Sequence, residues 1–71
     1  MVNYNKLWKR LIDENLKKTD LAKAVGISSA TLAKMSANET VSLETLVKIC
    51  NLFKCELSDI VTVLPSENKN N

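Results

Sequence analysis

"KTDLAKAVGISSATLAKM", residues 18–35, is the stretch from which the architecture of this chain can be worked out. It contains Gly26, the single glycine among 71 residues, whereas average usage would give about five. Two short helical patterns flank this glycine. A tight turn between two crossing helices needs one position with a positive φ, where glycine is least costly. Gly26 therefore predicts a corner between two helices.

The residues around Gly26 support that corner. Ala22 lies four residues earlier and is small enough for two helices to approach closely at their crossing. The second helix of the chain is expected to begin near Thr19, which can cap free backbone N–H groups, and the third after Ser28, which is a good N-cap. Asn38 suits the left-handed position after the third helix. The angle between the two helices is expected to be filled by Leu21, Val25, Ile27, Leu32 and Met35.

Apolar periodicity predicts further helices on both sides. The first, over residues 4–15, has an apolar stripe of Tyr4, Leu7, Trp8, Leu11 and Ile12. A fourth follows Ser42 and ends near residues 53–54, with Leu43, Leu46, Val47, Cys50 and Phe53 on one side. "CELSDI" reads as one helical turn, and the β-branched "VTV" as a short strand that Pro65 stops.

Length and composition predict one small domain. The chain is 45% hydrophobic and 25% charged, which is typical of a folded soluble protein. We expect the domain to span residues 1–64 and a polar, disordered tail to span residues 65–71. Two cysteines, Cys50 and Cys55, without any histidine do not make a metal site, so we expect reduced thiols packed as small apolar groups and no cofactor.

No apolar run is long enough to span a membrane. The beginning of the chain is polar and basic without a following apolar region, so a cytoplasmic location is expected. Catalysis is not expected, because the chain has no histidine, no phosphate-binding glycine loop and no cysteine paired with a base.

Charge is distributed unevenly along the chain. Residues 1–38 hold seven lysines and arginines against three acidic residues, whereas residues 39–71 hold three against five. A basic half on a nearly neutral protein indicates a polyanionic partner for one face.

The segment 18–35, together with "SLETLVKICNLFKCELSDI", resembles the phage-repressor-like (Cro/repressor, or xenobiotic-response-element) family of helix-turn-helix transcriptional regulators. The resemblance extends over roughly residues 7–60. It implies an all-α, compact, five-helix lambda-repressor-like bundle that binds double-stranded DNA. Some short members of the family carry strands at the two ends, so the resemblance also implies that "MVNY" can pair with "IVTV". It also implies that the N-terminal end of the third helix enters the major groove.

The resemblance implies two sets of DNA contacts. Base contacts fall on Ser29, Ala30, Lys34 and Asn38, with residue types that can hydrogen-bond base edges or pack on a thymine methyl. Phosphate contacts fall on Lys17, Lys18, Thr19, Ser28 and Thr31, which surround the ends of the two helices.

The chain departs from the family pattern at two places. The family often has glutamine at the position of Lys18, and a lysine there keeps attraction for phosphate but lacks the bidentate amide. The family also often has Gly-Lys where this chain has Asn38 and Glu39. The glutamate therefore replaces a phosphate-binding cation with an anion.

The resemblance implies a sequence-specific regulator, most simply a repressor that binds a palindromic operator as a homodimer. The end of the fourth helix, the short fifth helix and the "VTVLP" segment are the candidate dimer surfaces. No small-molecule ligand is evident. The alternative is a protein-interaction module, such as an antitoxin or an adaptor, built on the same helical scaffold.

Overall fold

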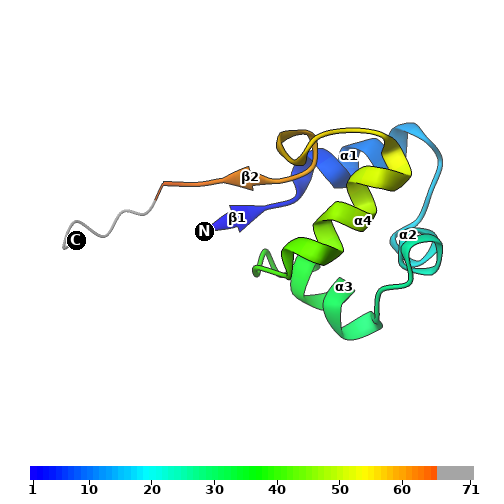
Figure 1. The fold of residues 1–71 in the computed structure, drawn as a ribbon, viewed down its shortest axis with the longest axis horizontal. Coiled ribbons are helices and arrows are strands. Elements are labelled where there is room, and N and C mark those ends of the chain that lie inside the picture. The colour runs from blue at the N-terminus through cyan, green and yellow to red at the C-terminus, as the bar shows by residue number, and fades with distance from the viewer. Residues whose placement is uncertain (66–71) are drawn as a thin grey trace.

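The computed structural model describes residues 1–65, which form a helical body and a short strand pair (Figure 1). The α-helices are α1 (Asn5–Asp13), α2 (Lys18–Val25), α3 (Ser29–Ser36) and α4 (Leu43–Phe53). A 3₁₀ turn, η1 (Leu57–Asp59), follows them. The strands are β1 (Val2–Asn3) and β2 (Thr62–Val63).

The prediction of five helices was wrong in its last member, because the described residues contain four α-helices. The segment "CELSDI" forms only the three-residue turn η1. A carboxylate oxygen of Asp59 accepts a hydrogen bond of 2.8 Å from the backbone N–H of Glu56, which caps the start of this turn. Ile60 then enters the core with 0% exposure, so the chain leaves helical geometry before a second turn can form.

The predicted pairing of the two ends is confirmed. β1 and β2 are antiparallel, with Val2 opposite Val63 and Asn3 opposite Thr62. The backbone N–H of Leu64 extends this pairing by donating to the carbonyl oxygen of residue 1 at 2.8 Å. The two strands project side by side from the helical body (Figure 1).

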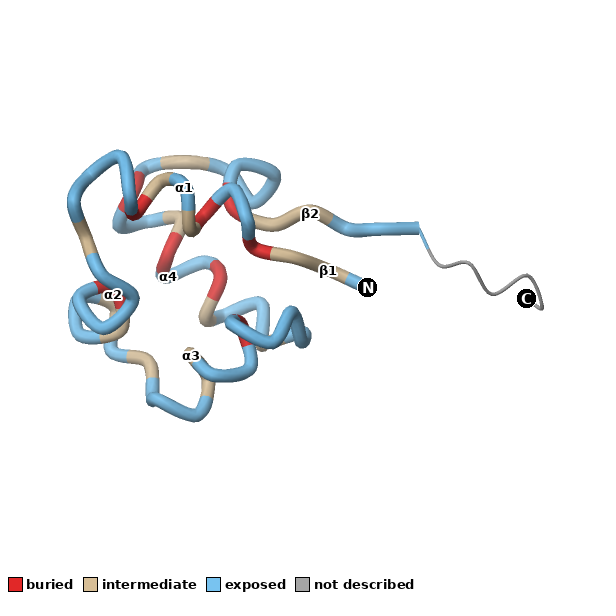
Figure 2. Tube along the Cα trace, turned by 180° about the vertical axis from the view of Figure 1, so that it is seen from behind, coloured by how far each residue is buried: buried red, intermediate tan, exposed pale blue. Residues whose placement is uncertain are grey.

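The core lies between the helices, and the outer faces of α2 and α3 are exposed (Figure 2). Leu7, Leu21 and Ile49 are completely buried and come from α1, α2 and α4. Burial of apolar area of this kind is the main stabilising term of a small domain. The whole buried cluster consists of Tyr4, Leu7, Leu11, Leu21, Met35, Leu46, Ile49, Phe53 and Ile60.

Three residues that the apolar pattern placed inward are exposed. Ile12 is 74% exposed, Leu43 62% and Val47 46%. On α4 the buried face is made by Leu46, Ile49 and Phe53. Because successive residues turn by about 100°, Leu43 lies about 120° and Val47 about 160° around the helix from Ile49, outside the buried face.

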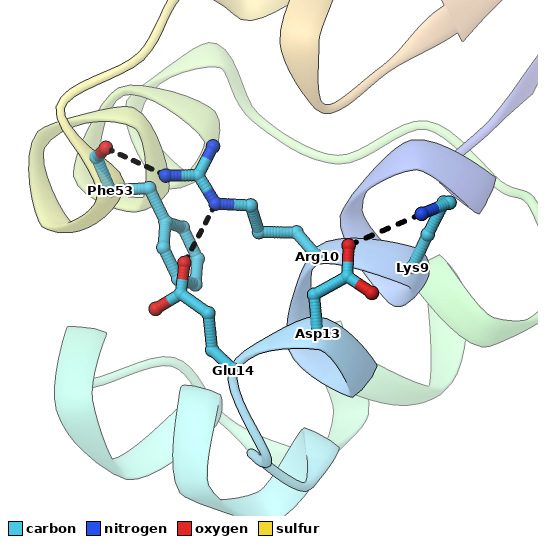
Figure 3. A network of polar contacts seen from close by, with 5 residues as sticks. All are labelled: Lys9, Arg10, Asp13, Glu14 and Phe53. Carbon is cyan, nitrogen blue, oxygen red and sulfur yellow. Dashed lines mark hydrogen bonds and ion pairs between the residues drawn. The ribbon is translucent and has the colours of Figure 1, made fainter.

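A polar network joins α1 to the end of α4 (Figure 3). Arg10 donates to a carboxylate oxygen of Glu14 at 2.8 Å and to the carbonyl oxygen of Phe53 at 3.3 Å, and its guanidinium lies 5.1 Å from the centre of the Phe53 ring. The hydrogen bond to Glu14 is the main cause that raises the pKa of Arg10. Lys9 pairs with Asp13 at 3.2 Å on the same helix. The contacts of Arg10 with Phe53 hold α1 against the end of α4.

Cys50 and Cys55 are free thiols, and both are half-buried. Burial raises the pKa of the Cys50 thiol. Both cysteines therefore pack as the small apolar side chains that the sequence predicts.

The expected domain boundary at residues 64–65 stays a prediction. The predicted disordered tail falls, apart from Pro65, on residues 66–71, which lie outside the described residues. None of the helices within residues 1–65 has the length and apolar character needed to cross a membrane.

Candidate nucleic-acid interface

Gly26 forms the corner between α2 and α3, as the sequence predicts. Its φ is 74° and its ψ is 36°, in the left-handed region. The backbone N–H groups of Gly26 and Ile27 both donate to the carbonyl oxygen of Ala22, at 2.8 and 3.1 Å. These bonds end α2 and start the turn, so the angle between the two helices depends on a backbone conformation that glycine adopts without strain.

Ser28 caps the start of α3. Its Oγ accepts a hydrogen bond of 3.1 Å from the backbone N–H of Thr31 and donates to Thr31 Oγ1 at 3.1 Å. Because the Ser28 hydroxyl hydrogen is used in that second bond, the hydrogen of the Thr31 hydroxyl remains available for an outside acceptor. The first turn of α3 is therefore locally ordered, and one donor there is left for a phosphate oxygen.

The predicted base-contacting residues Ser29, Ala30 and Lys34 lie on one exposed side of α3. Met35, the one buried residue of this helix, lies on the opposite side. At about 100° per residue, Ala33 falls between Ser29 and Ala30 on the exposed side. We call the surface formed by Ser29, Ala30, Ala33 and Lys34 the reading face. Within the described part of the chain no side-chain hydrogen bond involves Ser29 or Lys34, so both remain available to a partner.

Asn38 adopts the predicted left-handed conformation, with a φ of 60°. The backbone N–H of Asn38 donates to the carbonyl oxygen of Met35 at 3.0 Å, and that of Glu39 donates to the carbonyl oxygen of Lys34 at 2.9 Å. These two bonds make a Schellman motif, which satisfies carbonyl groups at the end of α3. Asn38 thus ends the helix, and its exposed side chain points away from the core cluster.

Tyr4 holds the segment that follows α3. Its hydroxyl donates to the carbonyl oxygen of Glu39 at 2.7 Å, and only 1% of the residue is exposed. Burial raises the pKa of the Tyr4 hydroxyl, which favours the protonated form that donates this bond. The loop beside the reading face is therefore anchored to α1.

The start of α2 differs from the prediction that Thr19 caps it. The helix begins at Lys18, and the capping position is Lys17. A carboxylate oxygen of Asp20 accepts a hydrogen bond of 2.8 Å from the backbone N–H of Lys17. Thr19 therefore lies in the first turn, exposed, where its hydroxyl is not used as the cap.

Lys18 is the one predicted phosphate-contacting residue whose charged group is engaged within the protein. Its Nζ lies 4.1 Å from the centre of the Trp8 ring and donates to Ser36 Oγ at 3.1 Å. Lys17, in contrast, has no side-chain partner in residues 1–65. The two neighbouring lysines thus have different environments.

The interface is electropositive. Four lysines lie between residues 17 and 38, whereas Asp20 is the one carboxylate on α2 and α3. The two ion pairs of the described chain join residues of α1 and its C-cap residue Glu14, so no carboxylate within residues 1–65 pairs with these lysines. The lysines are Lys17, Lys18, Lys23 and Lys34.

Sequence reasoning missed three contributors to this interface. Ala33 escaped notice because an alanine carries no polar signal, although its helical position places it on the reading face. Trp8 was interpreted as a packing residue, and Ser36 was not considered. Lys18 contacts Trp8, which is 10 positions away in the sequence, and Ser36, which is 18 positions away. Sequence periodicity carries no information at such separations.

Comparisons with known proteins agree with this geometry. Residues 6–66 match the family model of the Cro/C1-type HTH DNA-binding domain. Comparison with curated proteins gives no significant match. Among solved structures, the chain is similar to the transcriptional regulator VanUg in its crystal form II, with 51% sequence identity and a TM-score of 0.87. That alignment covers 92% of this chain and 87% of the other.

Proposed function

Because the chain belongs to the Cro/C1-type helix-turn-helix DNA-binding domain family, we propose that it is a sequence-specific transcriptional regulator that inserts the N-terminal end of α3 into the major groove. The observation that carries this proposal is the reading face, whose side chains are exposed and unpaired beside uncompensated lysines. A helix presented in this way fits the width of the major groove. The similar VanUg, a transcriptional regulator, supports the same role.

The proposed base contacts are those of Ser29, Ala30, Lys34 and Asn38. The serine hydroxyl can donate to or accept from a base edge, the alanine can contact a thymine methyl, and the lysine ammonium can donate to guanine O6 or N7. The exposed position of all four residues supports the assignment. Ala33, on the same side of the helix, adds a second small apolar group to this surface.

Phosphate contacts are proposed for the residues around the ends of α2 and α3. The Thr31 hydroxyl has a hydrogen available, and the Lys17 ammonium has no partner within residues 1–65. Backbone N–H groups at the start of a helix add further donors for an anion. The full set is Lys17, Thr19, Ser28 and Thr31, of which Ser28 would contribute its backbone N–H, because its hydroxyl hydrogen is donated to Thr31. Lys18, which the sequence groups with them, has its ammonium engaged by Trp8 and Ser36.

A fluorescence anisotropy titration tests the proposed function. The probe is a labelled duplex from the region upstream of the chain's own gene, compared with a scrambled duplex of equal composition, at several salt concentrations. We expect tighter binding to the first duplex and a steep loss of affinity with salt, with a slope of about −0.9 for each phosphate contacted. Binding that is absent or insensitive to salt contradicts the proposal and favours the interaction module.

Variants of the reading face refine that titration. Replacing Ser29 or Lys34 by alanine is expected to reduce the preference for the upstream duplex by about tenfold, because a lost base contact costs about 1–3 kcal/mol. Lys48→Ala, which removes an exposed lysine from α4 outside the interface, is the matched control and should keep the preference. Unchanged preference in both reading-face variants would contradict the assignment of these contacts.

We further propose that the chain acts as a homodimer on a palindromic operator and represses transcription from the cytoplasm. One α3 reaches only a few base pairs, and two copies placed about 34–36 Å apart would read successive major grooves. The strand pair supports this proposal, since Val63 is 75% exposed and Met1 81% exposed on a projecting ribbon that carries no charged side chain from residue 1 to 4 or 60 to 65. Uncharged strand edges are suited to pairing with another chain.

Sedimentation equilibrium tests the dimer. We expect the unaltered chain to dimerise and Val63→Lys to shift it to a monomer, because a charge on the ribbon opposes pairing of two identical edges. Leu57→Lys, at another exposed apolar position on η1, is the matched control. If Val63→Lys still dimerises and Leu57→Lys does not, the dimer interface lies at η1. That result would contradict dimerisation through β1 and β2.

A further inference from the structure

Three side chains from three helices meet beside the end of α3, and we call them the Lys18 clamp. They are Trp8, Lys18 and Ser36. Lys18 is the first residue of α2, Ser36 is the last residue of α3, and Trp8 lies in the middle of α1. The ammonium lies 4.1 Å from the centre of the indole ring and 3.1 Å from the serine hydroxyl. A cation at this distance over a tryptophan face is held by the ring quadrupole.

The indole itself is held in place. Trp8 is half-buried, and its ring centre lies 6.3 Å from that of Tyr4 at an interplanar angle of 59°. Tyr4 is buried and anchored to the carbonyl oxygen of Glu39, beyond the end of α3. The indole ring of Trp8, on which the Lys18 ammonium rests, is therefore fixed to the core. Through that ammonium the ring can restrain the position of Ser36.

The clamp acts on the end of α3 that is farthest from Gly26. The corner holds the first turn of the helix, whereas Met35 and the clamp hold its last turn. Two restraints about 12 Å apart define the direction of an eight-residue helix. Contacts to base edges tolerate an error of only about 10–20° in such a direction.

We propose that Lys18 is a positioning residue, which sets the tilt of α3 through Ser36 while it rests on Trp8, and that it is not a phosphate contact. This inference rests on the proposed function, since the tilt matters only if α3 reads DNA. In the DNA complex the ammonium stays on the indole, and its hydrogen bond to Ser36 keeps the reading face in register with the groove. The phosphate-binding lysine at this position is then Lys17, whose ammonium has no partner within residues 1–65.

Two methionine substitutions separate positioning from phosphate binding. Lys18→Met keeps most of the side-chain length and removes the charge, and Lys17→Met is the matched control at the neighbouring position. We expect Lys17→Met to weaken binding to the upstream and the scrambled duplex equally and to reduce the salt slope by about 0.9. We expect Lys18→Met to leave the slope unchanged and to reduce the preference for the upstream duplex by about 2- to 5-fold.

Ser36→Ala provides a second variant, since it removes the hydroxyl and leaves the ammonium in place. It should reproduce the loss of preference seen in Lys18→Met, and the double variant should lose no more than Lys18→Met alone. A salt slope that falls in Lys18→Met as it does in Lys17→Met would overturn the proposal. A preference that neither Lys18→Met nor Ser36→Ala changes would overturn it as well.

Trp8 is the single tryptophan of the chain and reports on the clamp without DNA. Lys18→Met is expected to change the fluorescence emission of Trp8 in the isolated protein, and adding the upstream duplex to the unaltered chain should leave that emission unchanged. Emission that moves on DNA binding to the value of Lys18→Met would show that the ammonium leaves the indole, which contradicts the inference. Failure of the unaltered chain to bind DNA would instead contradict the proposed function, while the emission of the isolated variants would still test the clamp.

Discussion

Replacing Met35 by alanine is expected to destabilise the folded chain by about 2–5 kcal/mol, because it removes a completely buried side chain and leaves a cavity. A domain of this size has a total stability of about 4–10 kcal/mol. Met35 is also the one buried residue of α3, so the reading helix loses its anchor in the core. Thermal and urea unfolding followed by circular dichroism should show a melting temperature lower by about 10 °C or more, and DNA binding should be lost at moderate temperature.

Lys34→Ala is the matched control for Met35→Ala. It lies one residue earlier on the same helix and is exposed, so its effect on stability should stay within about 0.5 kcal/mol. The two variants should therefore separate folding from recognition. A stability of Met35→Ala equal to that of Lys34→Ala would show that α3 is not held by this side chain.

Replacing Gly26 by valine is expected to lower the free energy of unfolding by about 1–3 kcal/mol and to reorient or unfold α2 and α3. The reason is the backbone, since no atom would lie within 4 Å of a Cβ at this position, whereas a φ of 74° is strained for a β-branched residue. The free energy of unfolding should fall, and affinity for the upstream duplex should fall further than the stability loss alone explains, because the angle between α2 and α3 changes.

Gly26→Asn is the matched control for Gly26→Val. Asparagine tolerates the left-handed conformation, and this chain already places it there twice, at Asn15 with a φ of 58° and at Asn38 with a φ of 60°. The asparagine variant should keep most of the stability and of the DNA binding. Normal binding and stability in Gly26→Val would mean that the corner does not set the helix angle.

Local signals predicted much of this fold because they depend on a few neighbouring residues. Ser28 and Ser42 cap their helices as expected, each accepting a hydrogen bond from the backbone N–H three residues later. Asn38 takes the left-handed position, and the two ends of the chain pair as strands. For the caps and for Asn38 the chemistry that produces the structure lies within the segment itself, whereas the strand pairing was implied by the resemblance to the family.

The errors arose where several arrangements compete over one segment. A fifth helix was expected after Cys55, but the segment forms only the three-residue turn η1, after which Ile60 is buried in the core. Thr19 was expected to cap the start of α2, although it is the carboxylate of Asp20 that binds the N–H of Lys17 there. A carboxylate three residues inside a helix satisfies an N–H group as well as a hydroxyl at the cap does, so the composition alone did not separate the two.

The candidate interface could be predicted as a set of residues but not as a set of contacts. Spacing places Ser29, Ala30 and Lys34 on one side of a helix, and the structure puts them on an exposed side. The environment of Lys18 depends on an indole and a hydroxyl from two other helices. Such tertiary neighbours follow from the packing of the whole domain, which is why a lysine interpreted as a phosphate contact proves to be engaged within the protein.

The reading face shares no residue with the buried core, and this separation bears on how operators and regulators change together. Ala30 and Ala33 present two methyl groups on a helix whose anchor, Met35, lies on the opposite side. Under the proposed function, exchanging either alanine for a polar residue is expected to alter which bases are preferred and to change the folding energy by only about 0.5 kcal/mol. A change of target site would then meet little opposition from the stability of the fold.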